Sequence, residues 1–273
     1  MVRAELRHIV FLAACACSKG PPPRTLSAEA VVEAPVRAMP AEAAPTAKSN
    51  DVPAPLACIV RYYNATARLA DDGWSLVLPD GQAIPYAQVE EVYELAYPHG
   101  AIKPVTAVDF DPGRVRIDAL MFATYGRNAK EVAAALTTVK IGGKVVLVHK
   151  KIAEPLRRVA ARIAEAAKHD GALSRFFESL GGTFNWRKIA GTDELSLHAW
   201  AIAIDLDTSR SSYWRNTNTT QPVWKNQYPQ AIVDAFESEG FVWGGRWYHY
   251  DTMHFEYRPE LLDPACYPAD TQR

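Results

Sequence analysis

The sequence lacks any hydrophobic run long enough to cross a membrane. Its longest apolar run, around Ile9 to Ala14, is far shorter than the roughly 18 to 20 residues that a membrane helix needs. It also lacks a surplus of charge, because 30 lysines and arginines are balanced by 31 aspartates and glutamates. Without a basic field or a basic patch, nucleic acid is excluded as a partner. This composition is typical of a globular protein with one main domain and appendages.

Two common kinds of metal site are missing as well. There is no Cys-x-x-Cys pair, so the four cysteines cannot form a zinc ribbon. A helical His-Glu-x-x-His site is excluded, because His249 and His254 are five residues apart with no helical period around them. Cys58 and Cys266 lie at the two ends of the globular part, where an oxidising compartment would let them bridge. We predict this disulfide, with two unpaired thiols as the alternative.

The first 18 residues are typical of an export signal. Arg3 and Arg7 supply positive charge, a short apolar core from Ile9 to Leu12 follows, and Leu-Ala-Ala-Cys15 resembles a bacterial lipobox. We predict lipidation of Cys15 and an exported protein of the periplasm or cell envelope, held at the membrane only by its lipid anchor. An ordinary signal cut elsewhere, or a misassigned start codon, is the alternative.

The region after the signal has no helical or strand period. Residues 19–56 are rich in proline and alanine and predict a disordered tether. Residues 57–110 predict a small β-rich part, with short strands at Cys58 to Tyr63 and Trp74 to Leu78. Further on, we expect helical pieces between Ala119 and Leu136, broken by Gly126, a strand at Val145 to Val148, and an amphipathic helix from Ile152 to Lys168.

Chemistry-bearing residues gather in the last third of the chain. Six of the seven tryptophans lie between Trp186 and Trp247, among polar residues, which favours a cleft wall over pure core. From Ala199 to Leu206 large and small residues alternate as in a strand, which places Asp205 on a face of small side chains. His198 stands just before this predicted strand.

A second segment, near residue 250, supplies the other candidate ligands. In a strand His254 and Glu256 share a face, and Asp251 lies three residues upstream. Zinc hydrolases commonly use three nitrogen or oxygen ligands and a nearby carboxylate that takes a proton from water. His198, Asp205 and His254 would supply the ligands, and Asp251 the carboxylate.

Together, Ser-x-His-x-x-x-x-Ala-x-Asp from Ser196 and Asp-x-Met-His-Phe-Glu from Asp251 resemble the zinc peptidase family of D-alanyl-D-alanine carboxypeptidases and L-alanyl-D-glutamate endopeptidases. The resemblance extends back through Gly182 to Arg187, and more faintly to Asp111-Pro-Gly-Arg-Val-Arg116. Ala201 replaces the glycine of the usual motif, and its methyl group is expected to narrow the substrate channel. Residues 111–273 would thus form the metallopeptidase domain.

The resemblance implies a role for each matching position. His198, Asp205 and His254 would bind one Zn²⁺, and Asp251 would be the general base. Arg187 would polarise the scissile carbonyl or hold a substrate carboxylate. Two residues have open alternatives: Ser196 binds substrate or caps the turn before the strand, and Glu256 supports His254 or is a solvated strand residue.

The implied protein is an α+β enzyme that cuts peptidoglycan stem peptides and acts as a monomer. Its antiparallel sheet would carry the zinc site, with helices packed on one side as in hedgehog and D,D-peptidase domains. The carboxypeptidase reaction is preferred, and the alternatives are the L-alanyl-D-glutamate endopeptidase reaction and a silent binding module. The loop from Asp207 to Gln230 is expected to wall the cleft, with Tyr213 or Trp214, and also Trp243, touching substrate.

Overall fold

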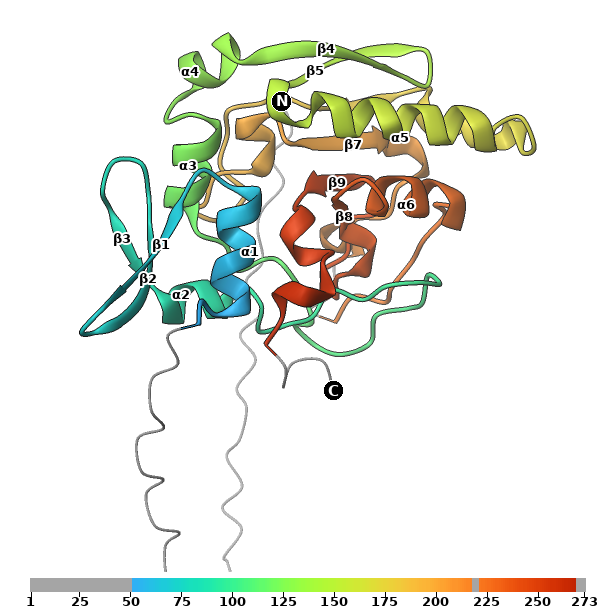
Figure 1. The fold of residues 1–273 in the computed structure, drawn as a ribbon. Coiled ribbons are helices and arrows are strands. Elements are labelled where there is room, and N and C mark those ends of the chain that lie inside the picture. The colour runs from blue at the N-terminus through green and yellow to red at the C-terminus, as the bar shows by residue number, and fades with distance from the viewer. Residues whose placement is uncertain (1–50, 218–220, 269–273) are drawn as a thin grey trace, which may run out of the picture. The chain divides into compact units, whose positions relative to one another are not determined.

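The computed structural model describes residues 51–217 and 221–268 (Figure 1). These residues form α-helices and three antiparallel sheets, which confirms the α+β prediction. In the described residues no helix is both long and apolar enough to cross a membrane. The predicted export signal, lipidation at Cys15 and most of the predicted tether lie outside the described residues.

A four-stranded antiparallel sheet carries the candidate ligands. Its strand order is β6-β7-β9-β8, and β7 pairs with β9 so that Asp205 lies directly opposite His254. The next pair along, Ile204 and Phe255, points to the other face and is buried. The predicted neighbouring strands for Asp205 and His254 are therefore confirmed. The bounds are Leu180–Gly182 for β6, Ala203–Asp207 for β7, Phe241–Trp243 for β8 and His254–Tyr257 for β9.

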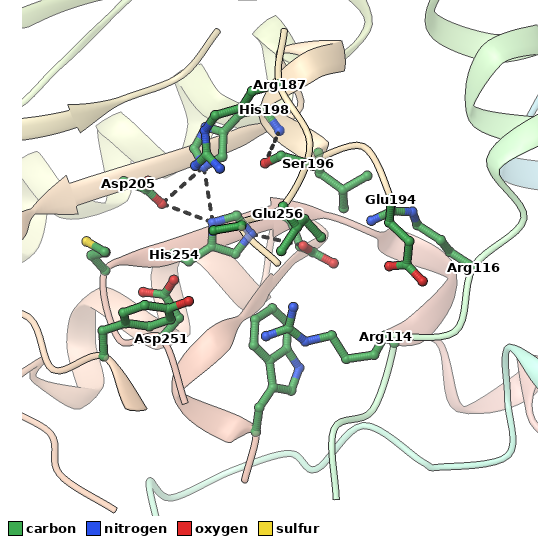
Figure 2. Close-up of a pocket in the computed structure, with 17 residues that line it drawn as sticks. Arg114, Arg116, Arg187, Glu194, Ser196, His198, Asp205, Asp251, His254 and Glu256 are labelled. Carbon is green, nitrogen blue, oxygen red and sulfur yellow. Dashed lines mark hydrogen bonds and ion pairs between the residues drawn. The ribbon is translucent and has the colours of Figure 1, made fainter. Parts of the chain in front are cut away.

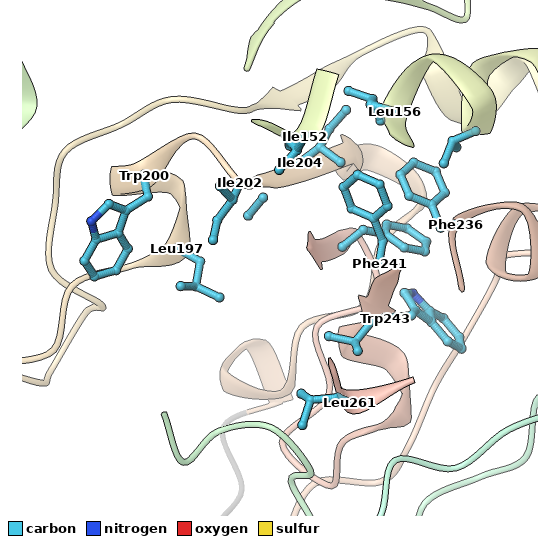
Figure 3. Close-up of a cluster of buried hydrophobic side chains, with 14 of the residues drawn as sticks. Ile152, Leu156, Leu197, Trp200, Ile202, Ile204, Phe236, Phe241, Trp243 and Leu261 are labelled. Carbon is cyan, nitrogen blue, oxygen red and sulfur yellow. The ribbon is translucent and has the colours of Figure 1, made fainter. Parts of the chain in front are cut away.

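The apolar face of this sheet is covered by two helices, α5 (Ala153–Ala166) and α6 (Gln230–Glu237). Figure 3 shows Leu156 of α5 and Phe236 of α6 meeting side chains from the sheet, and the Phe236 ring stacks on Phe255 at 4.1 Å between centroids. The predicted amphipathic helix from Ile152 to Lys168 is thereby confirmed as α5.

Next to this layer lies the hairpin of β4 (Leu136–Ile141) and β5 (Lys144–His149), which packs against α5. Gly142 and Gly143 join the strands, both with positive φ (54° and 81°), as a two-residue hairpin turn requires. The predicted strand at Val145 to Val148 lies in β5.

The structure corrects the predicted start of the globular part. Residues from Cys58 to Tyr63, predicted as a strand, lie mostly in helix α1 (Ala54–Tyr62), which begins inside the predicted tether. Proline early in the helix suits its first turn, and Leu56 and Ile59 are buried along one side. Cys58 of this helix forms a disulfide with Cys266.

The remaining elements agree more closely with the sequence. The predicted strand Trp74 to Leu78 is β2, and the predicted break at Gly126 separates α3 from α4, whose first turn is capped by the Asn128 side chain. The bounds are Thr66–Ala70 for β1, Gly73–Val77 for β2, Ala83–Pro85 for β3, Tyr86–Glu91 for α2, Asp118–Tyr125 for α3 and Ala129–Ala134 for α4.

The strand predicted from Ala199 is shorter than expected. Leu197–Trp200 form a 3₁₀ helix, and Ala201 ends it in the left-handed region at φ 54° before β7 begins at Ala203. The Ala201 methyl group is fully buried and does not line the pocket, so the expectation that it narrows the substrate channel is wrong. A turn here, rather than a strand, places His198 above the sheet.

Candidate metal centre

Three side chains converge on one point above the four-stranded sheet (Figure 2). His198 Nε2 lies 3.2 Å from both His254 Nδ1 and Asp205 Oδ1, and His254 Nδ1 lies 2.9 Å from Asp205 Oδ1. The three side chains are only 5% to 16% exposed, so they are largely shielded from solvent. We refer to His198, Asp205 and His254 as the metal cluster.

The opposite ring nitrogens of the two histidines have their own partners. His198 Nδ1 lies 3.3 Å from the Thr183 carbonyl oxygen, and His254 Nε2 lies 3.0 Å from Glu256 Oε2. A carbonyl and a carboxylate only accept hydrogen bonds, so the N–H of each ring belongs on that side. This leaves the lone pairs of His198 Nε2 and His254 Nδ1 aimed at each other and at Asp205, an arrangement that a cation stabilises.

The geometry and charge of the metal cluster fit a small divalent cation. Ligand atoms around a tetrahedral zinc ion are about 3.3 Å apart for bonds of about 2.0 Å, close to the spacing of the three facing atoms. The field favours positive charge: burial lowers the pKa of His254, but hydrogen bonds to Asp205 and Glu256 outweigh it and raise this pKa to about 10. Burial raises the pKa of Asp205, yet hydrogen bonds with both histidines hold it well below its usual value.

Asp251 lies beside the metal cluster: its backbone carbonyl oxygen accepts from the His254 N–H at 3.2 Å, and its side chain forms no hydrogen bond with the three candidate ligands. Its Oδ1 atom is buried without a hydrogen-bond partner among the described residues. Burial raises the pKa of this carboxyl to about 6, nearer to neutrality than an exposed aspartate. An unpartnered carboxylate beside three convergent ligands is suited to hold a water molecule and take its proton.

The backbone fixes the place of Asp251. Its N–H donates to the Gly244 carbonyl oxygen at 3.0 Å, and a Cβ added at Gly244 would lie only 2.5 Å from the Asp251 carbonyl oxygen. Only glycine permits this close approach. On the other side, Tyr213 forms an isolated antiparallel bridge with Asp251.

The metal cluster and Asp251 open into one pocket. Its walls come from the strands β7 and β9, the loop before the 3₁₀ helix, the segment from residue 113 to 116 and the long loop after β7. The lining residues are Gly113, Arg114, Arg116, Arg187, Ile189, Ala190, Glu194, Ser196, Leu197, His198, Asp205, Tyr213, Trp247, Asp251, Met253, His254 and Glu256.

Several residues singled out from the sequence reach this pocket. Arg187 lines it as an exposed side chain whose Nη1 donates to the Lys188 carbonyl oxygen at 3.4 Å. Ser196 lines it too, but its Oγ accepts from the His198 N–H at 3.4 Å, which is the capping alternative. Glu256 contacts His254, and is therefore no solvated strand residue.

The three aromatic residues predicted to touch substrate lie in different surroundings. Tyr213 lines the pocket, whereas Trp214 is absent from the lining and packs on His249, with 4.4 Å between ring centroids. Trp243 is fully buried and donates its Nε1–H to the Thr252 carbonyl oxygen, so its predicted contact with substrate is wrong. The alternation of residues in a strand shows which side chains share a face, but it does not show whether that face lines the core or the cleft.

Sequence reasoning assigned no role to two arginines that the structure places in the pocket. Arg114 and Arg116 lie far from the main motifs, in the segment that shows only a faint resemblance. Arg116 is held by Asp118 at 2.6 Å and donates to the Leu195 carbonyl oxygen. The Asp-Pro-Gly-Arg-Val-Arg pattern was the only available signal for them.

The fold and the site together have the donor set of a mononuclear metal hydrolase centre: two imidazole nitrogens, one carboxylate oxygen and a further free carboxylate. Residues 190–257 match the family model described as D-alanyl-D-alanine carboxypeptidase. That range contains the metal cluster and Asp251, and the match confirms the family resemblance of these motifs. It supports a peptidase acting on peptidoglycan in general. No curated protein and no solved structure shows a significant match to the chain.

Proposed function

We propose that the protein is a zinc-dependent peptidase that hydrolyses peptidoglycan stem peptides, with D-alanyl-D-alanine carboxypeptidase activity as the preferred reaction. The observation that carries the proposal is the metal cluster beside the unpartnered oxygen of Asp251. The family match over residues 190–257 supports the substrate class. The sheet with helices on one side would then be a variant of the hedgehog and D,D-peptidase arrangement.

His198, Asp205 and His254 would hold the zinc ion. When bound, zinc supplies a Lewis acid that polarises the scissile carbonyl and lowers the pKa of water. Thr183 and Glu256 fix the two imidazole rings, because each accepts the N–H on the side away from the metal.

The chain's own residues carry the proton and the developing charge. Asp251 would take the proton of the attacking water, since it lines the pocket beside the metal cluster and its pKa of about 6 lies near neutrality. The same carboxyl would return the proton to the departing amine. Arg187, exposed at the pocket wall, would stabilise the negative oxygen of the tetrahedral intermediate.

One observation favours the L-alanyl-D-glutamate endopeptidase reaction as a second candidate. Asp251 is one methylene shorter than the glutamate common at the base position of carboxypeptidases, and Met253 lines the pocket beside it. This combination resembles the endopeptidase branch. A silent binding module fits less well, because it would have no use for a free carboxylate beside an intact ligand set.

The cellular setting belongs to the same proposal. The export signal and lipobox predicted from the sequence would place a monomer at the cell envelope, anchored through Cys15. Stem peptides would then be its partners, and a tether would let the enzyme reach them.

Digestion of purified muropeptides by the zinc-loaded protein, with products weighed by mass spectrometry, tests the proposal. Loss of a terminal D-alanine supports the carboxypeptidase reaction. Cleavage between L-alanine and D-glutamate, which leaves one product ending in L-alanine and another beginning with D-glutamate, supports the endopeptidase reaction. The matched control is Asp251→Asn, which keeps the metal cluster. No cleavage of any muropeptide by zinc-loaded wild type would refute both.

A further inference from the structure

Arg114 is a pocket residue that the proposed reaction does not yet use. Figure 2 shows its side chain reaching into the pocket below His254 and Glu256. Its guanidinium carbon lies 4.2 Å from the ring centroid of Trp247, and the same indole lies 5.9 Å from the His254 ring. Trp247 therefore contacts the Arg114 side chain and lies near the His254 ring, so the Arg114 charge lies close to the metal cluster in the same pocket.

The backbone that carries Arg114 is firmly held. The buried Arg258 side chain donates to the Gly113 carbonyl oxygen at 3.0 Å, and the Trp247 indole N–H donates to the Pro112 carbonyl oxygen at 2.9 Å. Gly113 has φ 84°, and a Cβ there would lie 2.4 Å from Leu261. These contacts set the direction of Arg114 before any ligand arrives, which lowers the entropy cost of binding.

Arg114 differs from the other pocket arginines in its partners. Arg116 is paired with Asp118 and is only 8% exposed, so its charge is already matched. For Arg114, no carboxylate of the described residues lies within ion-pair distance, although its side chain lines the same pocket as Glu256 and Asp251. It stacks on Trp247 with its planar fork free, a common arrangement for binding a carboxylate by two hydrogen bonds.

We propose that Arg114 binds a carboxylate of the stem peptide next to the scissile bond and so determines substrate specificity. This inference rests on the proposed function. In the carboxypeptidase reaction the ligand is the C-terminal carboxylate, and in the endopeptidase reaction it is the α-carboxylate of D-glutamate. Arg187, on the opposite side of the metal cluster in Figure 2, remains available for the oxyanion.

The test compares three peptides: a free pentapeptide stem, the same peptide with an amidated C-terminus, and the same peptide with an amidated D-glutamate. Kinetic constants are measured for wild type, Arg114→Gln and Arg114→Lys. Arg157→Gln is the matched control, because it removes the same charge from the outer surface of α5. Binding of each peptide is also measured by calorimetry in zinc-loaded Asp251→Asn, with and without Arg114→Gln, so turnover is not required.

We expect Arg114→Gln to weaken binding and raise KM about 10- to 100-fold for peptides that keep the recognised carboxylate, with less change in kcat. Amidation of that carboxylate should raise the KM of wild type by a similar factor and change the KM of Arg114→Gln little. Arg114→Lys should bind the free peptide better than Arg114→Gln does, because it keeps the positive charge. The carboxylate that Arg114 recognises is the one whose amidation removes the difference in KM between wild type and Arg114→Gln.

Two outcomes separate failure of this inference from failure of the proposed function. If wild type cuts muropeptides but Arg114→Gln loses the same factor on free and amidated peptides, Arg114 is structural and the inference is wrong. If no muropeptide is cut, the proposed function fails, and calorimetry still decides on Arg114. Equal binding of free and amidated peptides would then overturn its role.

Discussion

At the scale of single residues, Asp251 and the metal cluster should respond differently to substitution. The Asp251 side chain forms no hydrogen bond with the three candidate ligands, and this unpaired carboxyl is the feature that suits it to proton transfer. His198 supplies one of the three facing atoms, and its ring is fixed by Thr183. The first residue should therefore matter for the reaction alone, and the second for metal and reaction together.

We predict that Asp251→Asn lowers kcat by at least about 100-fold, since general base catalysis contributes that much, and leaves zinc bound. His198→Ala should lose both zinc and activity, as should wild type treated with a chelator. Metal content by mass spectrometry and muropeptide turnover measure the two effects. Loss of zinc from Asp251→Asn would show that the division between ligands and base is wrong.

Ala201 tests the local geometry behind His198. Glycine adopts this left-handed backbone conformation without strain, alanine adopts it with some strain, and a β-branched residue would be the most strained. We predict that Ala201→Gly stays within about 1 kcal/mol of wild type in unfolding free energy, because relief of strain offsets the lost methyl group. Ala201→Val should cost more than about 2 kcal/mol and weaken zinc binding. Urea unfolding with zinc titration measures both, and equal stability of the two variants would contradict the strain.

At the scale of elements, the sequence predicted those that carry a clear period or turn. The helix α5 follows from the spacing of its apolar residues, β2 and β5 from short apolar runs beside turns, and β9 from the two-residue alternation around His254. The segment from Cys58 to Tyr63 was misread because a short apolar run fits a strand or a buried helix equally well. Trp243 and the turn at Ala201 were misread because tertiary packing, which a period does not encode, decides which face is buried.

The site was predictable to the extent that it lies in the two motifs. His198, Asp205 and His254 could be named from their spacing, and β7 and β9 then bring two of them together. The hydrogen-bond acceptors of the two histidine rings differ in how far the sequence predicts them. Glu256 shares a strand with His254, whereas Thr183 contributes a backbone carbonyl oxygen to His198 that no sequence pattern indicates. Arg114 comes from a segment more than 80 residues before the metal cluster, so only folding reveals it.

The long loop after β7 gives a prediction at this scale. Tyr213 lines the pocket, while the Trp214 ring packs on His249 and the Trp214 backbone N–H donates to the Tyr250 carbonyl oxygen at 3.0 Å. We predict that Tyr213→Ala raises KM for muropeptides several-fold with little change in melting temperature. Trp214→Ala should mainly lower the melting temperature, because it removes a packed aromatic pair. Enzyme kinetics and thermal melts of both variants measure these effects. A large fall in melting temperature for Tyr213→Ala, with a raised KM only for Trp214→Ala, would contradict the prediction.

At the scale of the whole molecule, a buried array of charged and polar side chains joins Tyr63, the residue that follows helix α1, to the metal cluster. The Tyr63 hydroxyl donates to Glu260 at 2.7 Å, Glu260 pairs with Arg258 at 2.5 Å, and Arg258 lies 3.7 Å from Glu256. Glu256 in turn accepts from the His254 ring. Because Arg258 and Glu260 are almost fully buried, removing one partner would leave an uncompensated charge. The N-terminal helix is thus part of the same folded body as the site.

The disulfide holds this helix in place. Cys58 and Cys266 are 208 residues apart, so their link closes nearly the whole described chain into one loop in the unfolded state. We predict that replacing both cysteines by alanine lowers the unfolding free energy by about 5 kcal/mol, because loop entropy grows with length. Zinc affinity of the folded protein should change little, since neither cysteine supplies a hydrogen bond or ion pair of the array from Tyr63 to Glu256.

Urea unfolding of the oxidised protein and of the double alanine variant, with zinc titration of each, measures these two quantities separately. Tyr63→Phe is the matched control, because it keeps the disulfide and removes one buried hydrogen bond, at a cost of about 1 to 3 kcal/mol. If the double alanine variant were as stable as wild type, the disulfide would not be what holds α1 to the domain. In that case the buried contacts of Leu56 and Ile59 would suffice.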